Sequence, residues 1–261
     1  MTGVELKAVL RDGPVAFGTF VSELATPAIA EMLAAVGFDF LVVDMEHSPT
    51  GTEAAAAIVM AARALGIAPL VRVAWHDRPS ILRPLDMGAA GIVVPMVEDE
   101  HQASSVVRYA KYPPTGARGV ALKRAHSRYR DVEPAQYTRE ANAETIVLAQ
   151  IETAAAVEHA AAIARVPGID GLFVGPSDLS HNLGYPEQLS APEVQRVLAA
   201  TIDVALRAGV AAGIHLSDPS SAGEWQRAGI RMITLGSDVA FLLAAARRAL
   251  EVARGAAEAA M

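Results

Sequence analysis

The sequence predicts an α/β protein with a (β/α)₈ TIM-barrel fold, and three observations support this. Eight short apolar runs are each followed by an Ala- and Leu-rich amphipathic stretch, the alternation that builds βα units around a parallel sheet. The runs are apolar without polar alternation, as strands buried on both faces are. Eight such units fit the 261 residues of the chain, because about 250 residues are typical of this barrel. A doubly wound open sheet is the main competing fold, but it gives no reason for eight units.

The predicted strands follow the apolar runs in chain order. They span 15–20, 40–44, 69–73, 91–95, 146–151, 171–174, 212–215 and 232–235. Ser, Thr, Asp and Pro are common where helices begin, and such residues mark most of the predicted starts. The helices are expected to begin near Pro27, Thr52, Ser80, Asp99, Thr153, Pro192, Pro219 and Asp238.

One segment, 112–145, breaks the pattern because prolines and glycines interrupt it at Pro113, Pro114, Gly116 and Gly119. Long insertions of this kind usually cover a functional site. Its basic stretch, 123–130, has three interpretations: an RNA-binding patch, a solvated face, or a lid that favours anionic substrates. The lid is the intermediate interpretation between the other two.

The organisation is that of one domain over 1–261, since the chain has no low-complexity linker and no fixed-period repeat. Its last stretch, 238–260, predicts one long Ala-rich helix that is more apolar than a solvated helix needs to be. We expect this helix to pack on another subunit.

Charge and cysteine content exclude several classes of function. The chain has 22 Lys and Arg against 29 Asp and Glu, a net charge of −7, which argues against a general nucleic-acid or membrane-surface binder. It has no cysteine, so disulfides, thiolate nucleophiles and zinc–sulfur sites are excluded. The expected compartment is the cytoplasm, with neither nucleic acid nor membrane as a partner.

Polar residues gather at the carboxyl ends of the predicted strands, where a barrel of this kind places its active site. Glu152 and Asp178 follow neighbouring strands, and hard carboxylate oxygens suit Mg²⁺ or Mn²⁺. The alternative is that each carboxylate caps the next helix, although Thr153 is a better cap than Glu152.

His47 follows a buried strand and is a candidate base, with Asp44 and Asp86 as candidates to hold its imidazole in one tautomer. Arg72 ends an apolar strand, where a guanidinium can stabilise an enolate or carboxylate oxygen. The alternative for Arg72 is an internal salt bridge to Glu46 or Asp44.

The turn 175–178 has backbone N–H groups that can hold a small carboxylate.

Several motifs, in order along nearly the whole chain, resemble those of the HpcH/HpaI aldolases, a family of metal-dependent class II pyruvate aldolases. The family includes 4-hydroxy-2-oxoheptanedioate and 2-dehydro-3-deoxyglucarate aldolases. The motifs are GFDF at 37–40, DMEH at 44–47, VR at 71–72, DMGA at 86–89, YPPTGARG at 112–119, QIE at 150–152, GPSDL at 175–179 and LGSD at 235–238.

The resemblance implies an enzyme, a carbon–carbon lyase of aromatic or sugar-acid catabolism. It would cleave 4-hydroxy-2-oxo acids reversibly to pyruvate and an aldehyde through a metal-stabilised pyruvate enolate. It also implies a homo-oligomer, either a hexamer built as a trimer of dimers or a trimer, whose last helix is exchanged between subunits.

The family's roles carry over onto matching positions. Glu152 and Asp178 would be ligands of Mg²⁺, Mn²⁺ or Co²⁺, His47 the base, Asp86 and Asp44 its support, and Arg72 the residue that stabilises the enolate. The implied substrate contacts are Arg72, Gln150, Gly175, Ser177, Asp178 and Leu216.

The sequence departs from the family pattern at 121–130 and at His215. We therefore expect the basic stretch 123–130 to favour aldehydes with a remote carboxylate or several hydroxyls. A Schiff-base mechanism is rejected because the three lysines, Lys7, Lys111 and Lys123, are not at strand ends. Two alternatives stay open: a CoA-ester lyase or decarboxylase on the same scaffold, and a non-catalytic binder of oxo acids.

Overall fold

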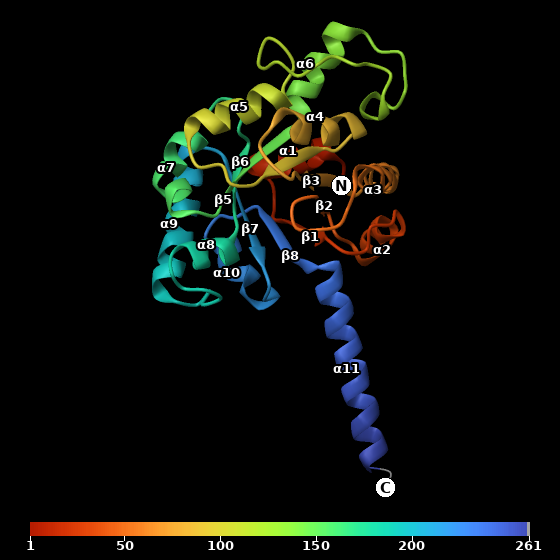
Figure 1. Cartoon of the computed structure of the whole chain (residues 1–261), viewed down its shortest axis with the longest axis vertical. Helices are drawn as coiled ribbons and strands as arrows, with labels where there is room; N and C mark the ends of the chain where they lie inside the picture. The colour runs from red at the N-terminus through yellow and green to blue at the C-terminus, as the bar shows by residue number, and fades with distance from the viewer. Residues whose placement is uncertain (260–261) are drawn as a thin grey trace.

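The strands of the computed structural model, which describes residues 1–259, form a closed parallel barrel in sequence order, with β8 paired to β1 (Figure 1). This confirms the predicted (β/α)₈ fold, and each predicted strand is found within two residues of its expected ends. The strands are β1 Ala16–Val21, β2 Phe40–Asp44, β3 Ala68–Arg72, β4 Gly91–Val94, β5 Ile146–Ile151, β6 Gly171–Val174, β7 Ala211–Leu216 and β8 Met232–Ser237.

The helices largely begin where the sequence places capping residues. Asp99 accepts a hydrogen bond from the Gln102 amide at 2.7 Å, and Thr153 accepts one from the Ala156 amide at 3.0 Å, so each satisfies a free N–H of the first turn. The helices are α1 Gly3–Asp12, α2 Ala28–Val36, α3 Thr52–Leu65, α4 Arg78–Met87, α5 Glu100–Ala110, α6 Pro134–Glu144, α7 Ala154–Ala164, α8 Pro176–Asn182, α9 Pro192–Ala208, α10 Ala222–Arg227 and α11 Asp238–Ala259.

Two hydrophobic layers hold the barrel together. One fills its interior, where Phe40, Leu70 and Phe173 are buried, and α1 adds Leu6 and Leu10 at the amino-terminal end of the strands. The other lies between the strands and the surrounding helices. Side chains that alternate along each strand supply both layers, which explains why the strands read as continuous apolar runs.

The segment 112–145 is more regular than expected. It contains a short 3₁₀ turn, Ala125–Ser127, and the helix α6, which starts where Glu133 accepts hydrogen bonds from the amides of Ala135 and Gln136. No residue of α6 is fully buried. The helix therefore lacks the apolar face by which sequence periodicity detects a helix.

The basic stretch 123–130 lies against α3 and α4. Arg63 at the end of α3 donates hydrogen bonds to the carbonyl oxygens of Ala125 and His126, at the amino-terminal end of the barrel. The expectation that this stretch forms a lid over the chain's own strand ends is therefore wrong, because those ends lie on the opposite side of the barrel.

The helix α11 projects away from the barrel (Figure 1). Its start is anchored by Asp238, whose carboxylate accepts hydrogen bonds from the amides of Ser22, Glu23 and Leu24. Beyond this point large apolar side chains are exposed, among them Leu242, Leu250 and Val252. None of the helices in the described part of the chain is long and apolar enough to cross a membrane.

Candidate active site

A cavity of about 320 Å³ opens at the carboxyl ends of the strands, where barrels of this type carry their active sites. Most of the residues that the sequence predicts for the site line it. Its wall comprises Phe20, Ser22, Asp44, His47, Arg72, Gln150, Phe173, Gly175, Pro176, Ser177, Asp178, His215, Gly236 and Ser237.

Arg72 and Asp44 form an ion pair with two hydrogen bonds at the cavity. Arg72 Nε and Nη2 donate to Asp44 Oδ1 and Oδ2 at 2.9 and 2.6 Å. Burial works against the charge of Asp44, but the hydrogen bonds and positive charge of Arg72 outweigh it and lower the pKa of that carboxyl. The internal salt bridge considered for Arg72 therefore exists, and the same side chain also lines the cavity.

Glu46 follows the strand end of Asp44, and the sequence suggested it only as a salt-bridge partner of Arg72. Its Oε2 is buried without a hydrogen-bond partner, 3.4 Å from Arg72 Nη1 and 3.7 Å from His47 Nε2. Burial raises the pKa of Glu46 to about 7. The charge of Arg72 lowers this pKa, while the neighbouring carboxylates raise it further. A carboxyl in such surroundings indicates a local excess of negative charge.

Glu152 is held in place by two donors. Its Oε1 accepts a hydrogen bond from the Met96 amide at 2.8 Å, and its Oε2 accepts one from Gln150 Nε2. Burial raises the pKa of Glu152, and the charge of Asp178 adds to the shift. A Cβ atom on Gly175 would lie 3.0 Å from Glu152 Oε2, so the glycine leaves room for this carboxylate.

The capping alternative fails for both candidate metal ligands. Thr153, and not Glu152, caps α7. Asp178 lies within the first turn of α8, whose N-cap is Gly175 and has no side-chain cap. Neither carboxylate therefore serves as a helix cap. Asp178 is exposed and lines the cavity, whereas Glu152 is only 3% exposed and is not among the lining residues.

The donor set fits a hard divalent cation. Three carboxylates, Asp44, Glu46 and Glu152, interact with the charge of Arg72. A fourth, Asp178, interacts with the charges of Glu46 and Glu152. Hard oxygen ligands are those that Mg²⁺ and Mn²⁺ prefer. Across residues 1–259, no three His, Cys, Asp or Glu side chains are arranged as a complete metal site. Two protein carboxylates would thus leave other coordination positions to water and substrate oxygens.

His47 lines the cavity with an exposed imidazole, but its expected supports differ from those found. Asp44 Oδ1 accepts hydrogen bonds from the backbone amides of Glu46 and His47 rather than from the ring. Asp86 lies in α4 and accepts a hydrogen bond from Arg118 at 2.7 Å. The expectation that Asp44 and Asp86 hold the imidazole is therefore not met within the chain.

Leu216 is also placed differently from the expectation. It packs in the layer between strands and helices, whereas its neighbour His215 lines the cavity, since adjacent side chains of a strand point to opposite faces. His215 Nδ1 lies 3.0 Å from Thr234 Oγ1, and its ring meets that of Phe20 edge to face at 5.4 Å. Burial lowers the pKa of His215 to about 4, so this imidazole is neutral at physiological pH.

No site role was predicted for four of the remaining wall residues. Ser22 and Ser237 lie at or just beyond the ends of β1 and β8, so the strand-end rule that selected the other residues applies to them too. The sequence gives no indication that Phe20 and Phe173 line a site, because an aromatic residue within an apolar run is expected to lie in the hydrophobic core.

Comparison with known proteins agrees with this geometry. The family model for HpcH/HpaI aldolase/citrate lyase matches residues 17–245. A hydroxypyruvate/pyruvate aldolase of Paraburkholderia phytofirmans is 38% identical over 258 residues, covering 95% of this chain and 97% of that protein. A 4-hydroxy-2-oxo-heptane-1,7-dioate aldolase of Escherichia coli is 36% identical over 252 residues, covering 96% and 94%.

Among solved structures, the HpcH/HpaI aldolase of Desulfitobacterium hafniense superposes with a TM-score of 0.92 at 32% identity, covering 95% of this chain and 96% of that one. The likeness therefore extends over the whole barrel and includes the strand ends that form the cavity. The chain belongs to the HpcH/HpaI aldolase/citrate lyase family.

Proposed function

We propose that the protein is a carbon–carbon lyase that cleaves 4-hydroxy-2-oxo acids reversibly to pyruvate and an aldehyde. One observation carries the proposal. At a cavity of about 320 Å³, the guanidinium of Arg72 is paired with Asp44, and further carboxylates lie nearby, so carboxylates outnumber the positive charge. Relatives at 36–38% identity that carry aldolase names support it over a CoA-ester lyase or a decarboxylase.

The metal site in this proposal consists of Glu152 and Asp178. The fixed orientation of Glu152, bound to the Met96 amide, and the absence of a capping role for either carboxylate support this assignment. When bound, a divalent cation such as Mg²⁺, Mn²⁺ or Co²⁺ supplies Lewis-acid stabilisation of the negative charge that develops on a 2-oxo acid.

Cleavage requires a base to take the proton of the 4-hydroxyl group. We assign this role to His47, whose imidazole lines the cavity and whose Nε2 lies 3.7 Å from Glu46 Oε2. The bond between C3 and C4 then breaks, and its electron pair forms the enolate of pyruvate while the aldehyde leaves. A proton returned to C3 completes pyruvate.

Arg72 supplies a fixed positive charge for the enolate oxygen. Asp44 holds the guanidinium through two hydrogen bonds, so little reorganisation is needed as charge develops. Asp44 thus acts as a positioning residue for Arg72.

The remaining substrate contacts are assigned to Gln150, Gly175, Ser177 and Asp178. Gly175 and Ser177 lie at the start of α8, where free backbone N–H groups favour a carboxylate. The wall at Phe20 and His215 faces the rest of the cavity and is assigned to the aldehyde part.

We also propose a homo-oligomer, a hexamer or a trimer, in which α11 docks on another copy of the chain. Leu242, Leu250 and Val252 are exposed by 56, 51 and 67%, and leaving such a surface in water is unfavourable. The cytoplasm is the proposed compartment, in keeping with a chain that has no cysteines.

The decisive experiment combines pyruvate with a panel of aldehydes in the condensation direction and identifies products by mass. In parallel, exchange of the pyruvate methyl protons in D₂O is followed by NMR with and without added Mg²⁺. Condensation products and metal-dependent exchange are expected. Binding of pyruvate with no exchange and no product would support a non-catalytic binder instead.

A further inference from the structure

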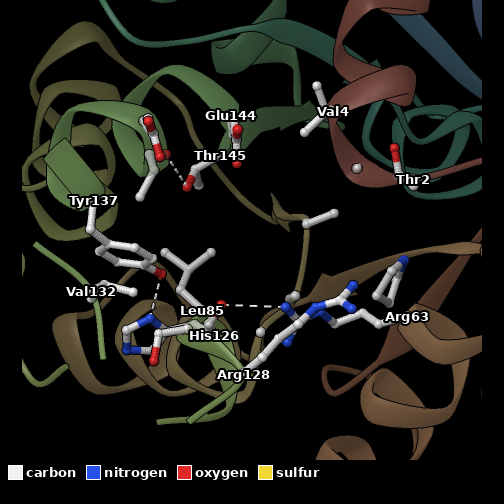
Figure 2. A pocket seen from close by; sticks show the side chains of 18 of the residues that line it. Thr2, Val4, Arg63, Leu85, His126, Arg128, Val132, Tyr137, Glu144 and Thr145 are labelled. Carbon is white, nitrogen blue, oxygen red and sulfur yellow. Dashed lines mark hydrogen bonds between the residues drawn. The ribbon is translucent and has the colours of Figure 1, made fainter. Parts of the chain in front are cut away.

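A second cavity, of about 420 Å³, lies at the opposite end of the barrel. Ile67, Pro69 and Ala90 contribute to it from the starts of β3 and β4, while α3, α6 and the basic stretch 123–130 form its sides. Figure 2 shows this cavity from close by. Because the candidate active site lies at the carboxyl ends of the strands, the two cavities are separated by the length of the barrel.

Arginines dominate one wall. Arg63, Arg128 and Arg130 line the cavity, and none of them has a carboxylate within ion-pair distance in the described part of the chain. Arg63 instead donates to the carbonyl oxygens of Ala125 and His126 at 2.6 and 3.3 Å. Arg128 and Arg130 are exposed, and Arg63 is half-buried. Three guanidinium groups that converge on one cavity without counter-ions can bind a phosphate or carboxylate group.

Like charges lie close together on this wall. Burial lowers the pKa of the Arg63 guanidinium, and the positive charges of Arg128 and Arg130 add to the shift. An anion between these side chains would relieve that repulsion.

Arg118 provides a buried donor at the same cavity. The residue is only 4% exposed, and it lines the cavity. Its Nη2 donates to Asp86 at 2.7 Å, but its Nε is buried without a hydrogen-bond partner among residues 1–259. A buried charged donor left unpaired is costly, so this part of the cavity wall has fewer acceptors than donors.

The facing wall has the opposite character. Glu140 and Glu144 of α6 line it together with Tyr137 and Thr145, and Figure 2 shows Glu144 and Thr145 across the cavity from Arg63 and Arg128. Burial raises the pKa of Glu144, and the charge of Glu140 adds to the shift. This wall accepts hydrogen bonds and does not attract a second anionic group.

We propose that the cavity binds a small organic anion that has its phosphate or carboxylate group at one end and hydroxyl groups at the other. The anionic group lies against Arg63, Arg128 and Arg130, and the hydroxyl groups donate to Glu140 and Glu144. A volume of about 420 Å³ is in the range of small-molecule sites and exceeds what a bare oxyanion fills.

The test is calorimetric titration of the full chain at constant ionic strength, since screening weakens all such contacts. The probes are glycerol 3-phosphate, malate, inorganic phosphate and uncharged glycerol. Three variants are compared with the unmodified protein: Arg128→Gln with Arg130→Gln, Glu144→Gln, and Arg196→Gln with Arg227→Gln. The last pair removes the same charge from two exposed arginines on α9 and α10.

We expect glycerol 3-phosphate or malate, but not glycerol, to bind saturably, and the preferred probe identifies the anionic group. Loss of Arg128 and Arg130 should weaken binding at least about tenfold, the factor for one lost charge-assisted contact, while the Arg196 and Arg227 pair leaves it unchanged. Glu144→Gln should weaken the organic probe and not inorganic phosphate.

Three results would overturn the proposal: no saturable binding of either organic anion, binding unaffected by the Arg128 and Arg130 changes, or equal binding of inorganic phosphate with no effect of Glu144→Gln. Because binding is measured directly, none of these results depends on aldolase activity.

Discussion

Arg72 and Asp44 are register partners on the neighbouring strands β3 and β2, and two hydrogen bonds of 2.6 and 2.9 Å join their side chains. Adjacent strand ends therefore fix a charged pair at the rim of the barrel. Its geometry depends on backbone pairing rather than on a flexible loop, which is how a cation can be held ready for a developing negative charge.

Arg72→Lys is expected to lower kcat of the aldol reaction by about 10²-fold or more, the usual loss when a fixed donor to an oxyanion is removed. A lysine ammonium keeps the charge but cannot form both bonds to Asp44. Steady-state kinetics with pyruvate and an accepted aldehyde measure the change. Arg83→Lys, at an exposed position of α4, is the matched control, and equal losses in both variants would contradict the assigned role.

Removal of divalent metal by a chelator, and separately Glu152→Ala, should each abolish turnover, because Glu152 and Asp178 are assigned as the two protein ligands. Turnover should return on adding Mg²⁺, Mn²⁺ or Co²⁺ to the chelated protein but not to the variant. Metal content is followed by elemental analysis, and folding by circular dichroism. Full activity in metal-free protein would show that the proposed mechanism is wrong.

His47→Ala should slow cleavage by about 10²-fold or more, the usual contribution of a positioned base, with metal affinity nearly unchanged. The expectation follows from an imidazole that lines the cavity without contacting Glu152. Turnover is compared with metal binding measured by titration. A variant that loses metal together with activity would make His47 a ligand.

His215 should make the protein less stable in acid. Burial lowers its pKa to about 4, whereas an unfolded histidine has a pKa of about 6.5. Between these values the unfolded chain binds a proton that the folded chain does not, so stability is lost as pH falls from about 6.5 to about 4, by up to about 3 kcal/mol.

The comparison is His215→Gln, followed by thermal unfolding at about pH 7 and about pH 4.5. The variant should lose less Tm on acidification than the unmodified protein, since glutamine does not titrate. The same loss of Tm in both proteins would mean that other groups control acid stability.

Deletion of residues 241–261 should leave dissociated or aggregated protomers, since it removes the large exposed apolar side chains of α11 while keeping the Asp238 anchor. Light scattering and size-exclusion chromatography report the oligomeric state. Deleting 256–261, beyond Leu250 and Val252, should leave the assembly intact. A stable, soluble monomer from the unmodified chain would rule out the docking role of α11.

The parts of the fold with strong apolar signals were predictable from the sequence. Strands such as Phe40–Asp44 and Ile146–Ile151 are buried throughout, so burial alone identifies them. The helices α1, α6 and α8 were not predicted. The helix α6 has no fully buried residue, the two buried leucines of α1 make too short a pattern, and α8 has only seven residues in a stretch expected to begin with a turn.

The site residues that lie at strand ends were predictable from the sequence. Arg72, Gln150 and His47 were selected by the strand-end rule and line the cavity. The partners of each side chain were not predictable, since Arg118 lies far along the chain from Asp86. Adjacent side chains of any strand face opposite sides. Which of His215 and Leu216 faces the cavity depends on how β7 pairs with β8, and the sequence does not specify this pairing.

The bonds between Asp238 and residues 22–24 join the last helix to the loop after the first strand, so α11 acquires its direction only when the barrel closes. A chain that has not yet paired β8 with β1 would present this apolar helix in no fixed orientation. In the proposed oligomer, assembly would thereby be coupled to completion of the protomer. An incomplete barrel would lack the geometry to bind a partner, and a finished one would associate through a helix whose direction is already fixed.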